Sequence, residues 1–248
     1  MVRGAGTALN VGAILVGSGL GVALRGRLPE RTRNTVTDAV GLLVLVIGGL
    51  NLAALTDPAY QRAVSESGTL LVVLGALVIG GIVGSLLRLE DRLEGLGAVL
   101  QRRLAGDGST ESRARFVEGF VSASLVFVVG PLAVLGALSD GMGRGIDQLA
   151  LKATLDGFAS LAFAASLGWG VAASALSVAV VQSILTLLGA LLGGLLPAAL
   201  VASVTATGGV LLLGVGLRLL QVKAVPVGDM LPALIAAPAL TALVDVLR

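Results

Sequence analysis

Long apolar runs dominate this chain, and short polar segments separate them. Each run is unbroken and rich in Leu, Ala, Gly and Val, whereas the strands of a membrane β-barrel alternate apolar and polar residues over about ten positions. A helix needs about 20 apolar residues to cross the hydrocarbon core of a bilayer. The pattern therefore predicts an all-α fold, a polytopic bundle of transmembrane helices. The eight expected spans are residues 6–24, 38–54, 69–88, 116–137, 149–168, 171–193, 203–220 and 230–246.

Two boundaries decide how many spans the chain has. Gly168-Trp169-Gly170 is the only interruption between the fifth and sixth runs, so a continuous helix there would reduce the count to seven. The first run follows Arg3, as a secretory signal would, but its length and the polar Asn10 within it favour a retained helix. We therefore expect residues 1–248 to form a single integral membrane domain.

The positions of the arginines predict the orientation. Short cytoplasmic loops carry an excess of Lys and Arg. Two connecting segments have this excess, and the loop between the last two runs has Arg218 and Lys223. We expect all three to be cytoplasmic, which places both termini outside. Arg3 and Arg248 oppose this orientation. The arginines of the two segments are Arg25, Arg27, Arg31 and Arg33, and Arg88, Arg92, Arg102, Arg103, Arg113 and Arg115.

Residues 89–115 are predicted to connect two spans on the cytoplasmic side. Between Leu89 and Leu104, leucine and valine recur at helical spacing among charged residues, which is typical of an amphipathic helix at a membrane surface. A glycine-containing loop follows, from Ala105 to Thr110. This helix could sense lipid or regulate the protein, or it could be only a solvated connector.

Composition narrows the function. Of the 248 residues, 56% are hydrophobic and only 13% are charged. The absence of Cys and His excludes thiol chemistry, haem, Fe–S clusters and a Ser-His hydrolase, and the chain has no nucleotide-binding motif. No basic patch carries interleaved aromatic residues, so we expect no nucleic-acid partner. The sequence predicts neither an enzyme nor a cofactor; a carboxylate-based enzyme is the alternative, since two acids can do general acid and base work. Its expected partners are the lipid bilayer and a small cation, and a homo-oligomer is left open.

Several segments occur twice along the chain. Asn10 and Gln182 each begin an apolar stretch that runs into a Gly-xxx-Gly motif. Leu-Pro at residues 28–29 and again at 196–197 precedes Thr-xxx-Gly, at 37–41 and 205–209. The third match joins the segment from Glu118 to Ser122 with the segment from Asp156 to Ser160, which both read acidic-Gly-Phe-x-Ser.

These matches predict an inverted internal repeat. The first run pairs with the sixth, the second with the seventh and the fourth with the fifth, which leaves the third to pair with the eighth. In the expected orientation the two members of each pair cross the membrane in opposite directions, as in many secondary transporters. Chance similarity between helices rich in Leu, Gly and Ala is the alternative. The related segments are residues 6–54 with 171–220, and 116–137 with 149–168.

Two acidic residues lie near the starts of predicted spans. An ionised carboxylate within the hydrocarbon core costs about 2.5–3.5 kcal/mol, so Glu118 and Asp156 are candidates for binding a cation. The alternative is that both lie at the membrane interface, where the positive end of a helix favours an acid.

Neutral oxygen ligands accompany the acids. The amides of Asn10 and Gln182 could each offer a carbonyl oxygen to a cation, or could only hydrogen-bond neighbouring helices together. Ser122 and Ser160 lie one turn beyond the two acids and could add hydroxyl oxygens. Hard cations prefer sites made of oxygen alone.

A glycine-rich, charged loop joins the two runs that carry the acids. Asp140, Asp147 and the nearby Lys152 could form the entrance to a site or an ion pair. A plain turn explains the glycines equally well.

Several segments resemble one bacterial membrane family. They are Phe127 to Gly136, Asp140-Gly141, Leu151-Lys152-xx-Leu155-Asp156-Gly157-Phe158, and Gln182. Over essentially its whole length the chain is similar to the YqgA-like family, known as domain of unknown function 554. The resemblance implies a multi-pass protein of the bacterial inner membrane with no established activity, for which a sodium channel or pump and a link to biofilm behaviour have been suggested. In that family the acidic-Gly loop continues into Gly-Asp, whereas Ile146 here separates Gly145 from Asp147.

Together these features predict a transporter or channel for a small cation of the Na⁺, H⁺ or Mn²⁺ class. The segment from Asp156 to Ser160 is also similar to the Asp-Ala-Phe-Ala-Val-Ser motif of small manganese exporters. The alternative is a non-transporting membrane scaffold or assembly factor, whose polar side chains only lock helices together.

Overall fold

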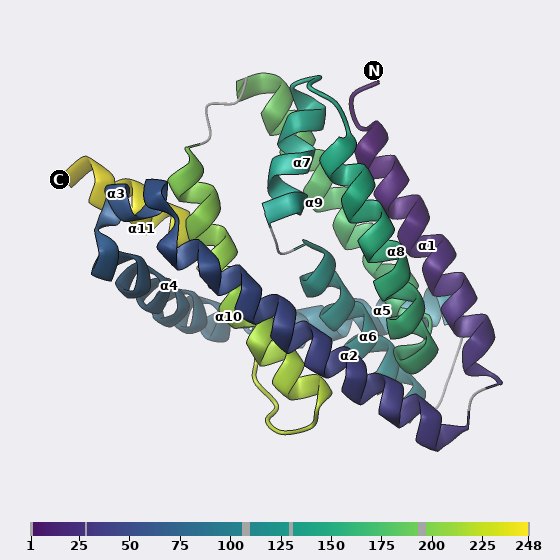
Figure 1. The fold of residues 1–248 in the computed structure, drawn as a ribbon. Coiled ribbons are helices and arrows are strands. Elements are labelled where there is room, and N and C mark those ends of the chain that lie inside the picture. Colours follow the sequence, from purple (N-terminus) through teal and green to yellow (C-terminus); the bar gives the residue numbers. More distant parts are fainter. Residues whose placement is uncertain (1, 28, 106–109, 129–130, 193–196, 248) are drawn as a thin grey trace. The chain divides into compact units, whose positions relative to one another are not determined.

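The computed structural model describes residues 2–27, 29–105, 110–128, 131–192 and 197–247 (Figure 1). Within these ranges every regular element is a helix. In chain order the elements are α1 (Ala5–Arg25), α2 (Glu30–Asn51), the 3₁₀ helix η1 (Leu52–Thr56), α3 (Pro58–Val64), α4 (Glu66–Leu86), α5 (Leu89–Ala105), α6 (Thr110–Val128), α7 (Pro131–Gly141), α8 (Asp147–Leu167), α9 (Gly170–Leu192), α10 (Ala198–Leu219) and α11 (Ala233–Leu247).

Five of the described helices are long and apolar enough to cross a membrane: α1, α2 together with η1, α4, α9 and α10. A sixth crossing results if α6 and α7 form one broken span. Lys152 and Asp156 lower the hydropathy of α8, and α11 has only 15 residues. Length and composition therefore support several membrane-spanning helices, but fewer than the eight expected from the apolar runs.

The two interruptions within long apolar stretches differ in kind. Between α8 and α9, Gly168 has a φ of +80°, a backbone conformation that glycine adopts readily. This residue makes the turn on which the higher span count depends. By contrast, the single helix expected over residues 116–137 is divided into α6 and α7, whose axes differ by 63°. Pro131 begins α7, and proline within a helix would remove a hydrogen bond and clash with the preceding turn.

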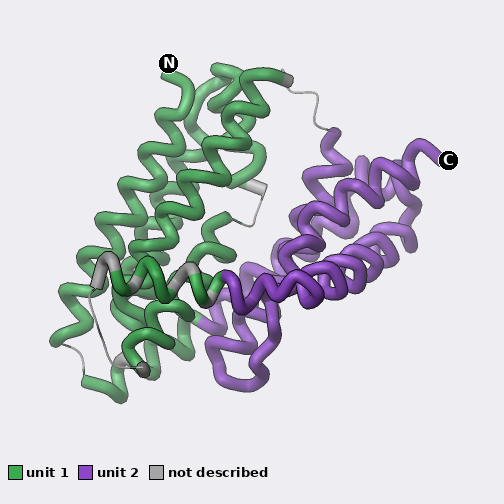
Figure 2. Tube along the Cα trace, turned by 180° about the vertical axis from the view of Figure 1, so that it is seen from behind, with its two compact units in different colours: residues 1–40, 93–128, 132–194 green, residues 41–92, 129–131, 195–248 purple. Residues whose placement is uncertain are grey.

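The chain forms two compact units (Figure 2). Unit 1 contains α1, α6, α8, α9 and nearly all of α7, and unit 2 contains α3, α4, α10 and α11. The helices α2 and α5 contribute residues to both. The bounds are Met1–Val40, Leu93–Val128 and Leu132–Gly194 for unit 1, and Gly41–Arg92, Val129–Pro131 and Leu195–Arg248 for unit 2.

In unit 1, α1 packs closely along α8, and the two helices run in the same direction (Figure 1). Glycine makes this approach possible. A Cβ atom added at Gly17 would lie 2.1 Å from the carbonyl oxygen of Gly157, and one added at Gly21 would lie 2.3 Å from that of Leu161. The first Gly-xxx-Gly motif therefore permits close helix packing.

The helices α6 and α9 also run parallel to one another. An added Cβ at Gly170 would lie 2.0 Å from the carbonyl oxygen of Phe116, and farther along, the Ser124 hydroxyl donates to Ser177 at 2.9 Å. Thr7 of α1 lies 3.5 Å from Thr186 of α9, hydroxyl to hydroxyl, where these two helices run in opposite directions. Hence α1 and α8 run one way through unit 1, and α6 and α9 run the other way.

In unit 2, glycines of α2 and α10 form a reciprocal contact. Both helices have 22 residues, and adding 168 to the residue numbers of α2 gives those of α10. An added Cβ at Gly48 would lie 2.9 Å from the carbonyl oxygen of Gly209, and one at Gly216 would lie 3.1 Å from that of Gly41. At the same offset Gly41 corresponds to Gly209 and Gly48 to Gly216, so each contact is the counterpart of the other. The two helices are antiparallel here.

The helices α3, α4 and α10 contribute to a small apolar core in unit 2. Its buried residues are Tyr60, Ala63, Val64, Val72, Ala199 and Ala202. The helices α4 and α11 are antiparallel, because Gly80 approaches Ala233 while Gly75 approaches Leu240.

Candidate functional site

A buried ion pair lies in the first half of α8. Lys152 precedes Asp156 by one helical turn, and its Nζ atom donates to Oδ1 at 2.9 Å and to Oδ2 at 2.7 Å. Both residues are only 6% exposed. A spacing of four residues places the two side chains on one helix face, and here that face is covered by neighbouring helices. Unit 1 therefore holds both members of an ion pair within its core.

Asn10 joins this pair from α1. Its Nδ2 atom donates to Asp156 Oδ2 at 3.0 Å, and the residue is fully buried. Its other amide atom, Oδ1, has no hydrogen-bond partner within the described part of the chain. Leaving a buried acceptor unpaired costs about 1–3 kcal/mol. Asn10 thus binds Asp156 with one end of its amide and presents a free oxygen with the other.

Gln182 is a second fully buried amide, in α9, and neither its Oε1 nor its Nε2 atom has a partner among the described residues. Asn10 follows Thr7 by one turn of α1, and Gln182 precedes Thr186 by one turn of α9. Because these helices are antiparallel where Thr7 meets Thr186, the next turn brings Asn10 and Gln182 to the same level. Three buried polar residues, Asn10, Lys152 and Asp156, are thus joined by hydrogen bonds, and Gln182 is buried at the level of Asn10. We call these four residues the polar group.

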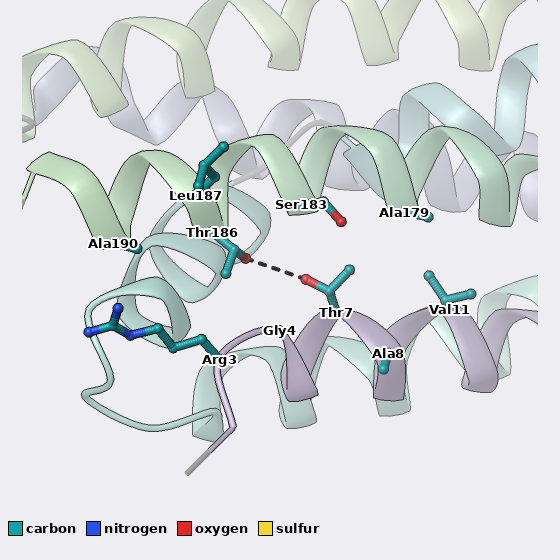
Figure 3. A pocket seen from close by; sticks show the side chains of 10 residues that line it. All are labelled: Arg3, Gly4, Thr7, Ala8, Val11, Ala179, Ser183, Thr186, Leu187 and Ala190. Carbon is teal, nitrogen blue, oxygen red and sulfur yellow. Dashed lines mark hydrogen bonds between the residues drawn. The ribbon is translucent and has the colours of Figure 1, made fainter.

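An open groove of about 600 Å³ lies between α1 and α9 (Figure 3). It runs from Arg3 and Ala190 at one end to Val11 and Ala179 at the other. Thr7, Ser183 and Thr186 supply its hydroxyls. Two residues that line the groove are next to the buried amides in the sequence: Val11 follows Asn10, and Ser183 follows Gln182. The groove therefore extends from the end of unit 1 that carries Arg3 to the level of the two amides.

The two serines proposed as ligands have different positions. Ser160 is buried one turn beyond Asp156, and its hydroxyl donates to the carbonyl oxygen of Gly157 on its own helix at 2.9 Å. It lies directly beneath α1, since an added Cβ at Gly17 would be 2.3 Å from Ser160 Oγ. Ser122 is buried in α6. Ser160 is therefore close to the polar group, whereas Ser122 belongs with Glu118.

Glu118 lies at a different level from Asp156. It is half-buried, and its neighbour Gly119 packs against Leu167 at the end of α8. Asp156 lies about 16 Å before Leu167 along the axis of α8, at 1.5 Å per residue. The two acidic candidates are therefore separated along the bundle, with Glu118 beside the α8–α9 turn.

The three residues proposed as an entrance do not form one group. Asp140 is buried and accepts the backbone N–H groups of Gly4 at 3.1 Å and Gly6 at 3.0 Å, so it caps the positive end of α1. Lys152 belongs to the buried pair. Asp147 is exposed at the start of α8.

The composition of the polar group limits what it can bind. No cluster of three or more His, Cys, Asp or Glu side chains occurs in the described ranges. The group offers one carboxylate, one ammonium and two amides, which suits a weakly held hard ion more than a tightly chelated metal. Asn10, Asp156 and Gln182 are predicted ligands, whereas Lys152 was expected at the entrance; its four-residue spacing from Asp156 is the signal in the sequence for the pair.

Comparisons with known proteins agree on one family. The model of a protein family of unknown function, DUF554, matches residues 5–242. The chain is 31% identical to the uncharacterised protein YqgA of Escherichia coli (strain K12), over 96% of both chains. It is 26% identical to the uncharacterised membrane protein YdfK of Bacillus subtilis (strain 168), over 94% of this chain and 93% of that one. No solved structure matches. The chain is therefore a membrane protein that belongs to the DUF554 family.

Proposed function

We propose that this protein is a membrane transporter for a small cation, and that the cation passes the polar group of Asn10, Lys152, Asp156 and Gln182. The observation that carries the proposal is the buried ion pair, with the incompletely bonded amide of Asn10 against it and the unbonded amide of Gln182 at the same level. Charged residues inside apolar helices are costly, and in membrane proteins they mark ion pathways more often than they stabilise the fold.

The helix directions within each unit support this proposal, because they are those that the expected inverted repeat requires. In unit 1 the paired helices α1 and α9 run in opposite directions, as do α6 and α8. In unit 2 the same holds for α2 and α10, with their reciprocal glycine contacts, and for α4 and α11. Eight crossings follow if α8, α11 and the broken pair of α6 and α7 each span the bilayer. Transporters with inverted repeats bind their ions near the bilayer midplane, often beside broken helices.

We further propose a multi-pass position in the bacterial plasma membrane, with the α8–α9 turn on the cytoplasmic side. Two arginine-rich segments support this orientation. Arg25 ends α1 next to the turn, since an added Cβ at Gly168 would meet its guanidinium. Arg115 lies at the same end of unit 1, because Phe116 contacts Gly170. Cytoplasmic loops carry such an excess of arginine.

Ion flux tests the proposal. Purified protein in liposomes should carry Na⁺, Mn²⁺ or protons, measured with radiolabelled Na⁺, a Mn²⁺-quenched dye and a pH-sensitive dye. Asp156→Asn should abolish the flux, because it removes the only carboxylate of the polar group. The matched control is Asp245→Asn, at an exposed position in α11, which should transport as the wild type does.

The scaffold alternative has one observation in its favour. The bond from Asn10 to Asp156 and the contact between Thr7 and Thr186 both join different helices, as polar side chains do when they stabilise a bundle. If the wild type moves none of the three ions, while Asn10→Leu and Gln182→Leu only lower the melting temperature, the scaffold interpretation is correct.

A further inference from the structure

The ammonium of Lys152 is already paired with the carboxylate of Asp156, to which a transported cation would bind. Its Nζ atom donates hydrogen bonds to both Asp156 oxygens, and Asn10 Nδ2 donates a further one to Oδ2. A cation can reach Asp156 only if the ammonium gives up at least one of these contacts. Lys152 therefore competes with the transported ion for the same oxygens.

Few other charges are near this pair. The helix α9 has no ionisable side chain, and α1 has only Arg25, its last residue. Asp140 of α7 accepts hydrogen bonds from backbone N–H groups at the start of α1, and Asp147 is exposed. The ionisable residues of α6 lie in its first half, toward the α8–α9 turn; they are Glu111, Arg113, Arg115 and Glu118. For the described residues, the net charge at the level of the pair is therefore zero.

We propose that Lys152 is a tethered counter-ion that neutralises Asp156 whenever the transported cation is absent, which allows the empty carrier to return across the membrane. This inference rests on the proposed function. Without Lys152 the empty site would hold an unpaired buried carboxylate, and removing one partner of a buried pair costs about 3–5 kcal/mol. With Lys152 in place, the empty site is neutral.

The same charge balance identifies the class of cation. With the ammonium of Lys152 beside Asp156, the loaded site has a net charge of +1 with a monovalent ion and +2 with a divalent ion. The larger charge is more costly in an apolar bundle. The free oxygens of Asn10 and Gln182 are neutral ligands that coordinate Na⁺ without adding charge. We therefore assign a monovalent hard cation, whose transport moves one charge per cycle.

The test separates net uptake from exchange. Radiolabelled Na⁺ uptake is measured into phosphatidylcholine liposomes that contain no Na⁺, where the empty carrier must return, and into liposomes loaded with unlabelled Na⁺, where it need not. The wild type should show both. Lys152→Gln should keep exchange but lose net uptake by about a hundredfold or more. Lys152→Arg keeps a cation beside Asp156 and should retain net uptake.

Lys223→Gln, at an exposed position after α10, is the matched control and should resemble the wild type in both assays. Absence of Na⁺, Mn²⁺ and proton flux with wild-type protein would refute the proposed function itself, whereas flux of Mn²⁺ or protons without Na⁺ would overturn this inference alone. If the wild type transports Na⁺ and Lys152→Gln keeps its net uptake, only the counter-ion role is refuted. If Lys152→Gln fails to fold, Lys152→Arg provides the test. Because arginine keeps a cation beside Asp156, loss of net uptake with intact exchange in this variant would overturn the inference.

Discussion

The two units use the same way of packing helices but differ in what they bury. In unit 1, glycines bring α1 against α8, and the same unit buries an ion pair and two amides. In unit 2, glycines bring α2 against α10, and the buried hydroxyls of Ser203 and Thr205 donate to carbonyl oxygens of their own helix. Close packing therefore does not require buried charge. This difference is why we attribute the charges of unit 1 to function.

The ion pairs of the two units sharpen this contrast. In unit 2, Glu90 accepts hydrogen bonds from Arg218 and from the Gly228 N–H, and both charged side chains are partly exposed, 17% for Glu90 and 23% for Arg218. Water can solvate either group if its partner is lost. Lys152 and Asp156 are each only 6% exposed, so water cannot solvate one of them in the same way if the other is lost.

The largest expected effect is the loss of one partner of the buried pair. Lys152→Met should lower the free energy of unfolding by about 3–5 kcal/mol, because it leaves Asp156 buried and unpaired. Arg218→Met, the matched change in unit 2, should cost about 1 kcal/mol. Denaturant unfolding in detergent, followed by the fluorescence of Trp169, the single tryptophan, measures both. Equal losses would show that the two pairs have the same role.

The glycine contacts should be equally sensitive in the two units. Gly17→Ala would place a methyl group 2.1 Å from a carbonyl oxygen and Gly48→Ala one 2.9 Å away, so each should destabilise the protein by about 1–3 kcal/mol. Gly19→Ala is the control in α1, because nothing lies within 4 Å of the added atom, and it should be neutral or slightly stabilising. A loss at Gly19 as large as that at Gly17 would contradict the packing described here.

The smallest effect at neutral pH concerns Tyr60, in the core of unit 2. Burial raises the pKa of this phenol to about 12 from 10.0, and the hydroxyl donates to the Thr69 carbonyl oxygen. The neutral phenol is thus favoured in the folded state. Stability should be unaffected below pH 10 and should fall as the pH rises from about 10 to 12, because only the unfolded chain ionises in that window.

Ultraviolet absorbance measures this titration directly, since Tyr60 is the only tyrosine. Tyr60→Phe should remove its contribution to the alkaline loss of stability. A phenolate midpoint near 10 in the folded protein would mean that the side chain is solvated and that the core of unit 2 is packed differently.

Much of the fold follows from local sequence. The Leu-Pro pairs and the apolar runs after them predict α2 and α10, because proline suits the start of a helix. Both helices begin before the expected spans, α2 at Glu30 instead of residue 38 and α10 at Ala198 instead of residue 203. The break before Pro131 was missed, since apolar residues continue across it and hydropathy alone does not register a bend.

The site was only partly predictable, for a physical reason. Asn10, Asp156 and Gln182 are conspicuous because polar side chains are rare in apolar runs. Whether Lys152 reaches outward to solvent or inward to Asp156 depends on which helix covers that face of α8. This is a property of the assembled unit, and the sequence near Lys152 does not contain it.

Voltage-driven uptake of radiolabelled Na⁺ by liposomes tests the central claim most directly, with wild-type protein, Asp156→Asn and Asp245→Asn compared at equal amounts of folded protein. Uptake by the wild type and by Asp245→Asn should increase with an inside-negative potential, and Asp156→Asn should reduce it to the level of protein-free liposomes. Uptake by Asp156→Asn equal to that of the wild type would contradict the claim that cations pass the polar group.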